Sequence, residues 1–414
     1  MGVEEARRVN TMSGQRGSGQ LSPLQITQGG SQQRAGSPTG VMTTHDVTIY
    51  SPASAGLFRP IGRTAGAQRQ MTLLAGELAR RGLRVALVVH PVPDDPPGVE
   101  PGVTLVRRKE HAGRSLLQTL VECGRVFRSL RAADGKVVVV RSGTPVVGLI
   151  ALYCRIFRRK LVFSSANNLD FLDQWSSRTR IYDFGVRSAD AVVVQSREQE
   201  PLARRRYPAI RKLVRIPSFA DQPPDAAPRT PTAFYWVGRL VDYKRPLLFA
   251  DLVEAVPDAR FVLIPLLPTL SANEEDALEQ LQAAAARNSN FEIRDSVPHA
   301  ALVDELAGAV ALVNTSSHEG MPNTFLEAWS QGVPVLTLSF DPDGVVAEHR
   351  LGISADGSWE RFVEGARELW AGRLEREEPA RRTRAYVRET HSLESVGARW
   401  QELVESVGGF RTGA

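Results

Sequence analysis

Short apolar runs alternate with longer amphipathic segments along most of this chain. Val85–Val89 is a continuous apolar run, which is typical of a strand buried on both faces of a parallel sheet. It follows a shorter strand pattern at Val47–Tyr50 and a segment, Ala67–Arg81, whose apolar residues recur on one helical face. A strand, a helix and a strand within about 45 residues predict a parallel βαβ unit.

The same alternation continues to the end of the chain. In the first half we expect helices and strands at Leu116–Leu130, Val137–Val140, Val146–Ile156, Leu161–Ser164 and Ala191–Val194. In the second half we expect them at Ala233–Val237, Pro246–Ala255, Arg260–Ile264, Glu274–Arg287, Phe291–Ile293, Ala301–Ala309, Val310–Asn314 and Val333–Leu338, before two terminal helices. Gly82 and Gly332 follow helical segments, where glycine commonly ends a helix in a left-handed conformation.

Two segments without periodicity divide the chain. Residues 1–45 are rich in Gly, Ser, Gln, Thr and Arg, so we expect a disordered tail. Residues 221–232 hold four prolines and are expected to be a linker. The expected domains are therefore 46–220 and 233–392, both Rossmann-like, followed by a C-terminal helix and tail at 393–414. Two doubly wound domains in tandem predict that ligands bind beyond the carboxyl ends of the strands.

Composition narrows the class of protein. The net charge of +5 and the pI of about 9.4 favour an anionic partner, either a phosphate ligand or a membrane surface. Cys123 and Cys154 are too few for a disulfide framework, which favours a reducing cytoplasm and disfavours a structural zinc site. No apolar run reaches the roughly 18 residues that a membrane span needs. The N-terminus has no apolar stretch typical of a signal peptide, so we expect a cytoplasmic, non-spanning protein.

The segment SSHEGMPNTFLEAW, residues 316–329, follows an expected strand and leads into an expected helix. Thr324-x-x-Glu327 fits a capping box, which would give Glu327 a purely structural role. Glu319 lies in the loop, where it is either an exposed residue or a ligand contact. The backbone of residues 320–323 leads to a helix N-terminus, whose free N–H groups and dipole favour an anion such as a diphosphate.

A second candidate segment, FYWVGRLVDYKRP, spans residues 234–246. Its strand ends at Gly238, where the backbone can approach a ligand closely. Arg239 offers a bidentate fork to phosphate oxygens and Lys244 a point charge. Two solvated loop cations would give the same pattern. The chain has neither a G-x-G-x-x-G after its first strand nor a G-x-x-x-x-G-K-[ST] segment, which disfavours a nicotinamide enzyme and a P-loop NTPase.

Together, these motifs resemble the retaining glycosyltransferases of family 4, which have the α/β GT-B architecture: two tandem Rossmann-like doubly wound domains facing a cleft. The matching residues are Val237-Gly-Arg-Leu240 with Lys244, Glu319-x7-Glu327, Gly332-Val-Pro-Val335 and, more loosely, Gly66-Ala-Gln-Arg69, Leu78–Gly82 and Ala189–Ser196. The resemblance covers residues 46 to 400. It implies transfer of a sugar from a UDP- or GDP-sugar to a glycan or lipid-linked acceptor, in surface polysaccharide biosynthesis.

The resemblance also implies roles for single residues. Arg239, Lys244 and Glu319 are the expected catalytic residues: the two cations would neutralise the leaving diphosphate, and the carboxylate would contact the donor sugar. Glu327 would bond the ribose hydroxyls. The other expected donor-binding residues are Gly66, Gly238, Val297 in the base-facing loop 294–297, Gly320, Met321, Pro322 and Asn323. No metal and no cofactor besides the nucleotide-sugar substrate are expected, because fixed cations would do a metal's work.

One feature departs from the family's pattern, and one short motif offers a rival interpretation. Many members carry a histidine after the strand that matches Leu161–Ser164, whereas this chain has Asn167, Asn168 or Asp170 to line the acceptor site. The alternative function is therefore a non-catalytic nucleotide-sugar-binding or scaffold protein of the same fold. Asp341-Pro-Asp-Gly344 contains D-x-D, the metal motif of the other glycosyltransferase fold, but Asp-Pro and Asp-Gly also form turns.

Basic residues lie beside aromatic residues on two expected helices of the first domain, within 126–131 and 153–160, and again at 204–215. Such segments fit either an anionic lipid surface or the solvated faces of core-packed helices. Because similar enzymes act on lipid-linked acceptors, an anionic membrane surface is an expected partner, and the protein would be peripheral on the inner face of the membrane. No nucleic-acid-reading motif is present, so nucleic acid is not an expected partner.

Overall fold

The computed structural model describes residues 44–58, 66–94, 96–109, 116–171, 179–220, 229–266 and 271–412. The expected tail at 1–45, apart from its last two residues, lies outside this part of the chain. Residues 221–228 of the expected linker also lie outside it.

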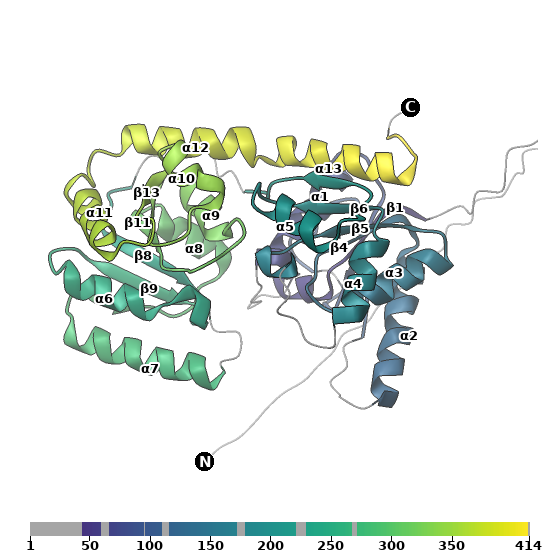
Figure 1. Cartoon of the computed structure of the whole chain (residues 1–414), viewed down its shortest axis with the longest axis horizontal. Coiled ribbons are helices and arrows are strands. Elements are labelled where there is room, and N and C mark those ends of the chain that lie inside the picture. The colour runs from purple at the N-terminus through teal and green to yellow at the C-terminus, as the bar shows by residue number, and fades with distance from the viewer. Residues whose placement is uncertain are drawn as a thin grey trace, which may run out of the picture. The chain divides into compact units, whose positions relative to one another are not determined.

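The first domain is built on a seven-stranded sheet in which every neighbouring pair is parallel (Figure 1). Its strands are β1 (His45–Tyr50), β2 (Val85–Val89), β3 (Val103–Arg107), β4 (Gly135–Val140), β5 (Lys160–Ser164), β6 (Ala191–Val194) and β7 (Leu213–Arg215). Its helices are α1 (Gly66–Arg80), α2 (Leu116–Ala133), α3 (Val146–Ile156), α4 (Thr179–Ser188) and α5 (Gln199–Arg206), with short 3-10 turns η1 (Pro52–Phe58) and η2 (Asn168–Phe171). The strand order, β3-β2-β1-β4-β5-β6-β7, reverses between β1 and β4.

The second domain repeats this plan with six parallel strands. They are β8 (Ala233–Gly238), β9 (Phe261–Pro265), β10 (Phe291–Ile293), β11 (Ala309–Asn314), β12 (Val335–Thr337) and β13 (Gly352–Ser354). The helices are α6 (Leu247–Ala255), α7 (Ala272–Arg287), α8 (His299–Leu306), α9 (Asn323–Ser330), α10 (Val345–Glu348), α11 (Trp359–Ala371) and α12 (Glu377–Thr390), with 3-10 turns η3 (Asp242–Lys244) and η4 (Pro342–Gly344). The order, β10-β9-β8-β11-β12-β13, reverses between β8 and β11.

Each sheet is covered by apolar side chains on both faces, which gives two cores in each domain. The last helix, α13 (Leu393–Gly408), packs against α1, and its Trp400 lies in the same core as Val47 and Leu74. The end of the chain therefore belongs to the packing of the first sheet. No helix in the described ranges is long and apolar enough to cross a membrane.

The two doubly wound parallel domains confirm the predicted fold class. The expected helix ends at Gly82 and Gly332 are confirmed by their positive φ angles of 84° and 79°. Three helices rather than two end the chain. The helix expected at Ala301–Ala309 instead spans His299–Leu306, because β11 already begins at Ala309 and its first residue is fully buried in the sheet core.

Two glycines let α3 and α4 pack at very short range. A Cβ added to Gly148 would lie 2.1 Å from the backbone oxygen of Ile181, and one added to Gly185 would lie 2.6 Å from Val147 C. Real Cβ atoms do not approach backbone this closely, so neither position accepts a larger side chain without moving a helix.

We expect Gly148→Ala to lower the free energy of unfolding by about 1–3 kcal/mol, since the added methyl group meets backbone that cannot rotate away. Gly124→Ala is the control, because a Cβ at Gly124 on α2 meets nothing within 4 Å. That change should instead raise stability by about 0.5–1 kcal/mol through helix propensity. Urea unfolding of both variants measures the difference, and equal stabilities would contradict the close α3–α4 contact.

Candidate active site

Two loops meet at the point where the strand order of the second sheet reverses. One follows β8 and runs through η3 to Arg245, and the other follows β11 and runs from Thr315 to Pro322. In open parallel sheets this reversal leaves a crevice outside the carboxyl ends of the two strands, where ligands bind. Both segments singled out in the sequence thus lie at the place that the topology favours.

Lys244 and Glu319 form an ion pair between these loops. Lys244 Nζ lies 2.6 Å from Glu319 Oε1, and the side chains are only 18% and 13% exposed. Ser316 Oγ donates a second hydrogen bond, of 2.9 Å, to the same oxygen. Because both bonds end on Oε1, a ligand hydroxyl could still bond to Oε2.

The backbone on both sides of Lys244 is tied to the strand ends. Thr315 Oγ1 donates to the backbone oxygen of Lys244 at 2.6 Å and accepts from Trp236 Nε1 at 3.0 Å. A Cβ on Gly238 would lie 3.2 Å from Lys244 Cδ, so the glycine lets the lysine stem pass close to the end of β8. The ammonium group is therefore held by loop geometry as well as by its carboxylate partner.

Arg245 fixes the loop in a way that the sequence pattern did not indicate. Its φ of 47° is left-handed, a conformation that non-glycine residues seldom adopt. Its guanidinium donates to the backbone oxygens of Thr315 (2.6 Å) and Ser316 (3.1 Å) and to Ser339 Oγ (2.7 Å). One side chain thus joins the loops that follow β8, β11 and β12.

Arg239 lies at a more open position than Lys244. Its guanidinium pairs with Glu274 at 2.9 Å and is 47% exposed, whereas the Glu274 side chain is 3% exposed. Glu274 belongs to the capping box that starts α7, and the backbone N–H of Ser271, more than Arg239, holds the pKa of Glu274 below its ordinary value. A buried carboxylate therefore positions the half-exposed cation.

The capping box expected at Thr324 and Glu327 is wrong. Helix α9 begins at Asn323, its N-cap is Pro322 in an extended conformation, and this N-cap makes no side-chain bond. Since the helix starts earlier than expected, Thr324 lies inside its first turn. The Glu327 carboxylate instead lies 2.8 Å from His299 Nε2 on α8 and is 14% exposed. His299 had no signal in the sequence, because it becomes a neighbour only through helix packing.

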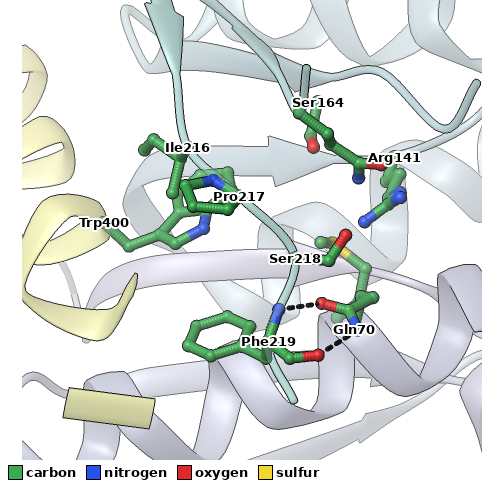
Figure 2. A pocket seen from close by; sticks show the side chains of 10 residues that line it. Gln70, Arg141, Ser164, Ile216, Pro217, Ser218, Phe219 and Trp400 are labelled. Atoms are coloured by element: carbon green, nitrogen blue, oxygen red, sulfur yellow. Dashed lines mark hydrogen bonds between the residues drawn. The ribbon is translucent and has the colours of Figure 1, made fainter. Parts of the chain in front are cut away.

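The start of α9 also contacts residues of α1. A Cβ on Gly66 would lie 1.6 Å from Asn323 Nδ2, so a larger residue there would displace the Asn323 side chain. Gln70 Nε2 donates to Asn323 Oδ1 at 3.0 Å. As Figure 2 shows, the Gln70 amide also exchanges two bonds with the backbone of Phe219, of 2.7 and 2.8 Å. Gly66 and Asn323, both expected donor-binding residues, are thus brought together.

The remaining expected donor-binding residues lie around these groups. A Cβ on Gly320 would lie 3.4 Å from the backbone oxygen of Ala166, so this turn also approaches the first domain. Met321 and Val297 both pack, partly buried, against the core that contains Trp329. Arg294 in the expected base-facing loop is committed to two carboxylates, Glu292 at 2.7 Å and Glu305 at 3.1 Å.

The rings of Tyr243 and His318 stack beside the Lys244–Glu319 pair. Their centroids lie 5.0 Å apart, and the Tyr243 backbone oxygen accepts from Ser317 N at 2.8 Å. Sequence reasoning missed this pair because its members lie on different loops, 75 residues apart by number. The stack joins the two loops independently of the ion pair.

The two aspartates of the D-x-D segment accept hydrogen bonds from backbone N–H groups near the starts of two helices. Asp341 accepts from the backbone N–H groups of Val346 (2.8 Å) and Ala347 (3.0 Å) at the start of α10. Asp343 accepts from Arg197 N (2.7 Å) and Glu198 N (3.1 Å) before α5. The segment forms the turn η4, which confirms the turn interpretation.

In the first domain, Asp170 is used to shape the loop that follows β5. Its carboxylate accepts from Ala166 N (2.6 Å), Asn167 N (3.3 Å) and Ser165 Oγ (3.1 Å). Burial raises the pKa of Asp170, and these bonds oppose that shift. Among the three residues considered for the acceptor site, Asp170 therefore positions the loop that holds the other two.

A cavity of about 10 Å³ lies at the carboxyl edge of the first sheet (Figure 2). Arg141, Ser164, Gln195 and Ser218 line it from the ends of β4, β5, β6 and β7. Arg141 Nε, Gln195 Oε1 and Ser218 Oγ are buried without a hydrogen-bond partner in the described part of the chain. Burial lowers the pKa of Arg141 to about 10, although Asp170 opposes the shift. The space suits one water molecule and is too small for a sugar.

Two family models match the chain, one for each sheet. Residues 65–218 match the glycosyl transferase 4-like domain, and residues 231–371 match the glycosyl transferases group 1 domain. The two matches together cover more than half of the sequence. No curated protein sequence matches the chain.

Several solved structures share the fold at low sequence identity. Sucrose-phosphate synthase from Thermosynechococcus elongatus aligns with a TM-score of 0.68 and 14% identity, over 88% of this chain and 99% of its own. HepE from Anabaena in complex with UDP gives 0.66 and 14%, over 87% and 100%. A variant of TarM from S. aureus in complex with fondaparinux, alpha-GlcNAc-glycerol and UDP gives 0.67 and 10%, over 87% and 100%. The likeness confirms the two-domain GT-B fold.

Proposed function

We propose that this chain, which its two matched domains identify as a glycosyltransferase with the GT-B fold, is a retaining enzyme of the family-4 type. It transfers a hexose or related sugar from a nucleotide-sugar donor to a glycan or lipid-linked acceptor. The reaction needs no metal, because Arg239 and Lys244 supply the positive charge. In the Glu319-x7-Glu327 pair, Glu319 binds the sugar of the donor and Glu327 binds its ribose.

The observation that carries this proposal is the Lys244–Glu319 pair at the strand reversal. A cation and a carboxylate 2.6 Å apart, both mostly buried, stand where an α/β sheet binds its ligand. The pair is too well supported by Thr315 and Ser316 to be two solvated loop residues. A ligand with both negative charge and hydroxyl groups, such as a sugar diphosphate, can use both members.

The chemistry follows from where charge develops. As the bond between the sugar and the diphosphate breaks, negative charge grows on the leaving phosphate oxygen, and cations fixed near it stabilise that state more than the ground state. Lys244 and Arg239 would each bind these phosphate oxygens while keeping their carboxylate partners, Glu319 and Glu274. Glu319 Oε2 would accept a hydrogen bond from a sugar hydroxyl and so orient the donor sugar ring. In a retaining transfer of this kind, the leaving phosphate would take the acceptor's proton.

The start of α9 supports the position of the nucleotide. The first-turn N–H groups of a helix have no intrahelical acceptors, so those of Asn323 and Thr324 can bind a phosphate oxygen. Glu327, one turn further along, would accept from the ribose hydroxyls while bonded to His299. Because HepE and TarM are solved with UDP, UDP-sugars are the first donors to test, with GDP-sugars next.

The first domain would hold the acceptor at the carboxyl edge of its sheet, near Asn167, Asn168 and Arg141. We place the reaction in surface polysaccharide biosynthesis in the cytoplasm, with an anionic membrane surface as a partner. The family resemblance, the net charge of +5 and the two free cysteines support this setting.

A non-catalytic nucleotide-sugar-binding protein is the second candidate. It is favoured by the absence of a histidine after β5 and by the use of the nearby Asp170 carboxylate in the loop itself. Such a protein would keep the donor site but would not cleave the donor.

A thermal-shift panel of UDP, GDP and their sugars tests the proposed function. A ligand at about 100 times its Kd should add about 2.7 kcal/mol to the free energy of unfolding, and at least one nucleotide sugar should exceed its parent nucleotide. Release of nucleotide from that donor then separates the two candidates. Slow hydrolysis or transfer supports the enzyme, and tight binding without turnover supports the binding protein. No shift with any of these ligands would contradict both.

A further inference from the structure

Exposed apolar side chains gather on three helices of the first domain. Seven large apolar residues are exposed in the described ranges, and five of them lie on α2, α3 and α4. These five are Val121, Leu152, Ile156, Ile181 and Phe184, with exposures from 38% to 56%. Apolar patches that stay exposed usually mark a surface for a membrane or a partner.

The same helices carry positive charge beside the apolar residues. Five of their arginines are exposed: Arg128, Arg131, Arg155, Arg180 and Arg187. The described residues of these helices include two carboxylates, Glu122 and Asp183, and each pairs with an arginine from another segment. We call this surface, made of the five apolar residues and five arginines, the α2–α4 face. The α2–α4 face is therefore positively charged.

The three helices form one continuous surface. Phe127 on α2 packs edge-on against Tyr153 on α3 at 5.5 Å, and the contact of Gly148 with Ile181 holds α3 against α4. Figure 1 shows α2, α3 and α4 as neighbours. A depression of about 430 Å³ between α2 and the end of α3 is lined by Phe127, Arg128, Arg131, Ala132 and Phe157.

We infer that the α2–α4 face binds an anionic lipid bilayer. Apolar side chains can enter the boundary between headgroups and acyl chains while arginines beside them contact lipid phosphates. A second copy of the chain fits less well, because a two-fold contact would set five arginines against five without compensating carboxylates. The depression is lined by two arginines, which can bind a headgroup phosphate, and by two phenylalanine rings.

This inference deepens the proposed function. Only the delivery of a lipid-linked acceptor rests on that function, whereas binding to a bilayer does not. Helices α3 and α4 begin after the carboxyl ends of β4 and β5, at the edge where Arg141 and Ser164 lie. Ile181 and Leu149 stand at that end of the helices, so a bilayer on the α2–α4 face would reach the edge of the acceptor domain. A lipid-linked acceptor could then enter the site without leaving the membrane.

Co-sedimentation with vesicles tests the inference directly. The full chain should bind vesicles of phosphatidylcholine and phosphatidylglycerol and should not bind vesicles of phosphatidylcholine alone. Arg128→Gln/Arg155→Gln should weaken binding by about fivefold for each arginine. Ile181→Ser/Phe184→Ser should weaken it by about tenfold or more, since both side chains are exposed and neither belongs to a buried core cluster.

Matched changes elsewhere serve as controls. Arg260→Gln/Arg287→Gln removes two exposed arginines of the second domain, and Leu374→Ser removes an apolar side chain that is 72% exposed. Both should bind vesicles like the unchanged chain. Absent binding, equal loss in the controls, or a dimer that the face variants abolish would overturn the inference. Donor-induced thermal shifts should stay unchanged in every variant, so a failure of the donor site would be seen separately.

Discussion

Replacing Lys244 by alanine should lower kcat for sugar transfer by about 10²–10³-fold, the effect of removing one preorganised stabiliser of developing negative charge. The ammonium group is 18% exposed and is held beside the carboxyl end of β8, so water cannot replace it well. Because the interaction strengthens as the diphosphate leaves, kcat should fall more than KM rises. Initial rates over a range of donor concentrations would separate the two effects.

Lys160→Ala is the matched control for this change. Lys160 also pairs with one carboxylate, Asp190 at 3.0 Å, but its side chain is 51% exposed on the surface of the first domain. Surface pairs of this kind contribute little, so its kcat should not change. Lys244→Arg should not restore activity, because a longer side chain with a planar guanidinium cannot take the place of a compact ammonium held 2.6 Å from Glu319 Oε1. Near-normal turnover in Lys244→Ala would remove the main support for the proposed mechanism.

The sequence predicted the central part of each sheet well, because central strands are buried on both faces and read as continuous apolar runs. Val85–Val89 and Ala233–Val237 lie where they were expected, within one residue. Edge elements carry a weaker pattern, which explains the strands that were missed. β3 is partly exposed along its length, and β7 and β13 have three residues each. Helix α5, QEPLARRR, has almost no apolar face.

The site was predictable as far as its residues belong to two contiguous segments. Gly238, Lys244 and Glu319 lie together at the strand reversal, as the motif spacing indicated. The supporting groups could not be found in this way. Arg245 acts through a left-handed backbone conformation, and His299 reaches Glu327 only because α8 packs beside α9. Such partners depend on tertiary contacts that no local pattern encodes.

Exchanging the two glutamates of the site for glutamine should give two different binding defects. In Glu319→Gln, the Kd for UDP should stay nearly unchanged while that for the UDP-sugar rises by roughly 10–100-fold, the loss of one hydrogen bond to a charged acceptor. In Glu327→Gln, the Kd values for UDP and for the UDP-sugar should rise together, because the ribose is common to both. Calorimetric titration of each variant with both ligands measures the ratio directly.

The difference follows from how each carboxylate is held. Glu319 lies in the loop with one oxygen bonded to Lys244 and Ser316, so the carbonyl oxygen of a glutamine can keep both bonds. The change removes the negative charge and turns the other oxygen, an acceptor, into an NH2 donor. Glu327 belongs to α9, whose Trp329 is fully buried, so an altered helix could also weaken binding. His299→Gln separates these routes, since it changes the other side of the 2.8 Å contact and leaves α9 intact. A smaller loss of affinity in that variant, equal for UDP and UDP-sugar, would assign the ribose to Glu327. If Glu319→Gln and Glu327→Gln instead changed the ratio of the two Kd values equally, both carboxylates would act on one group.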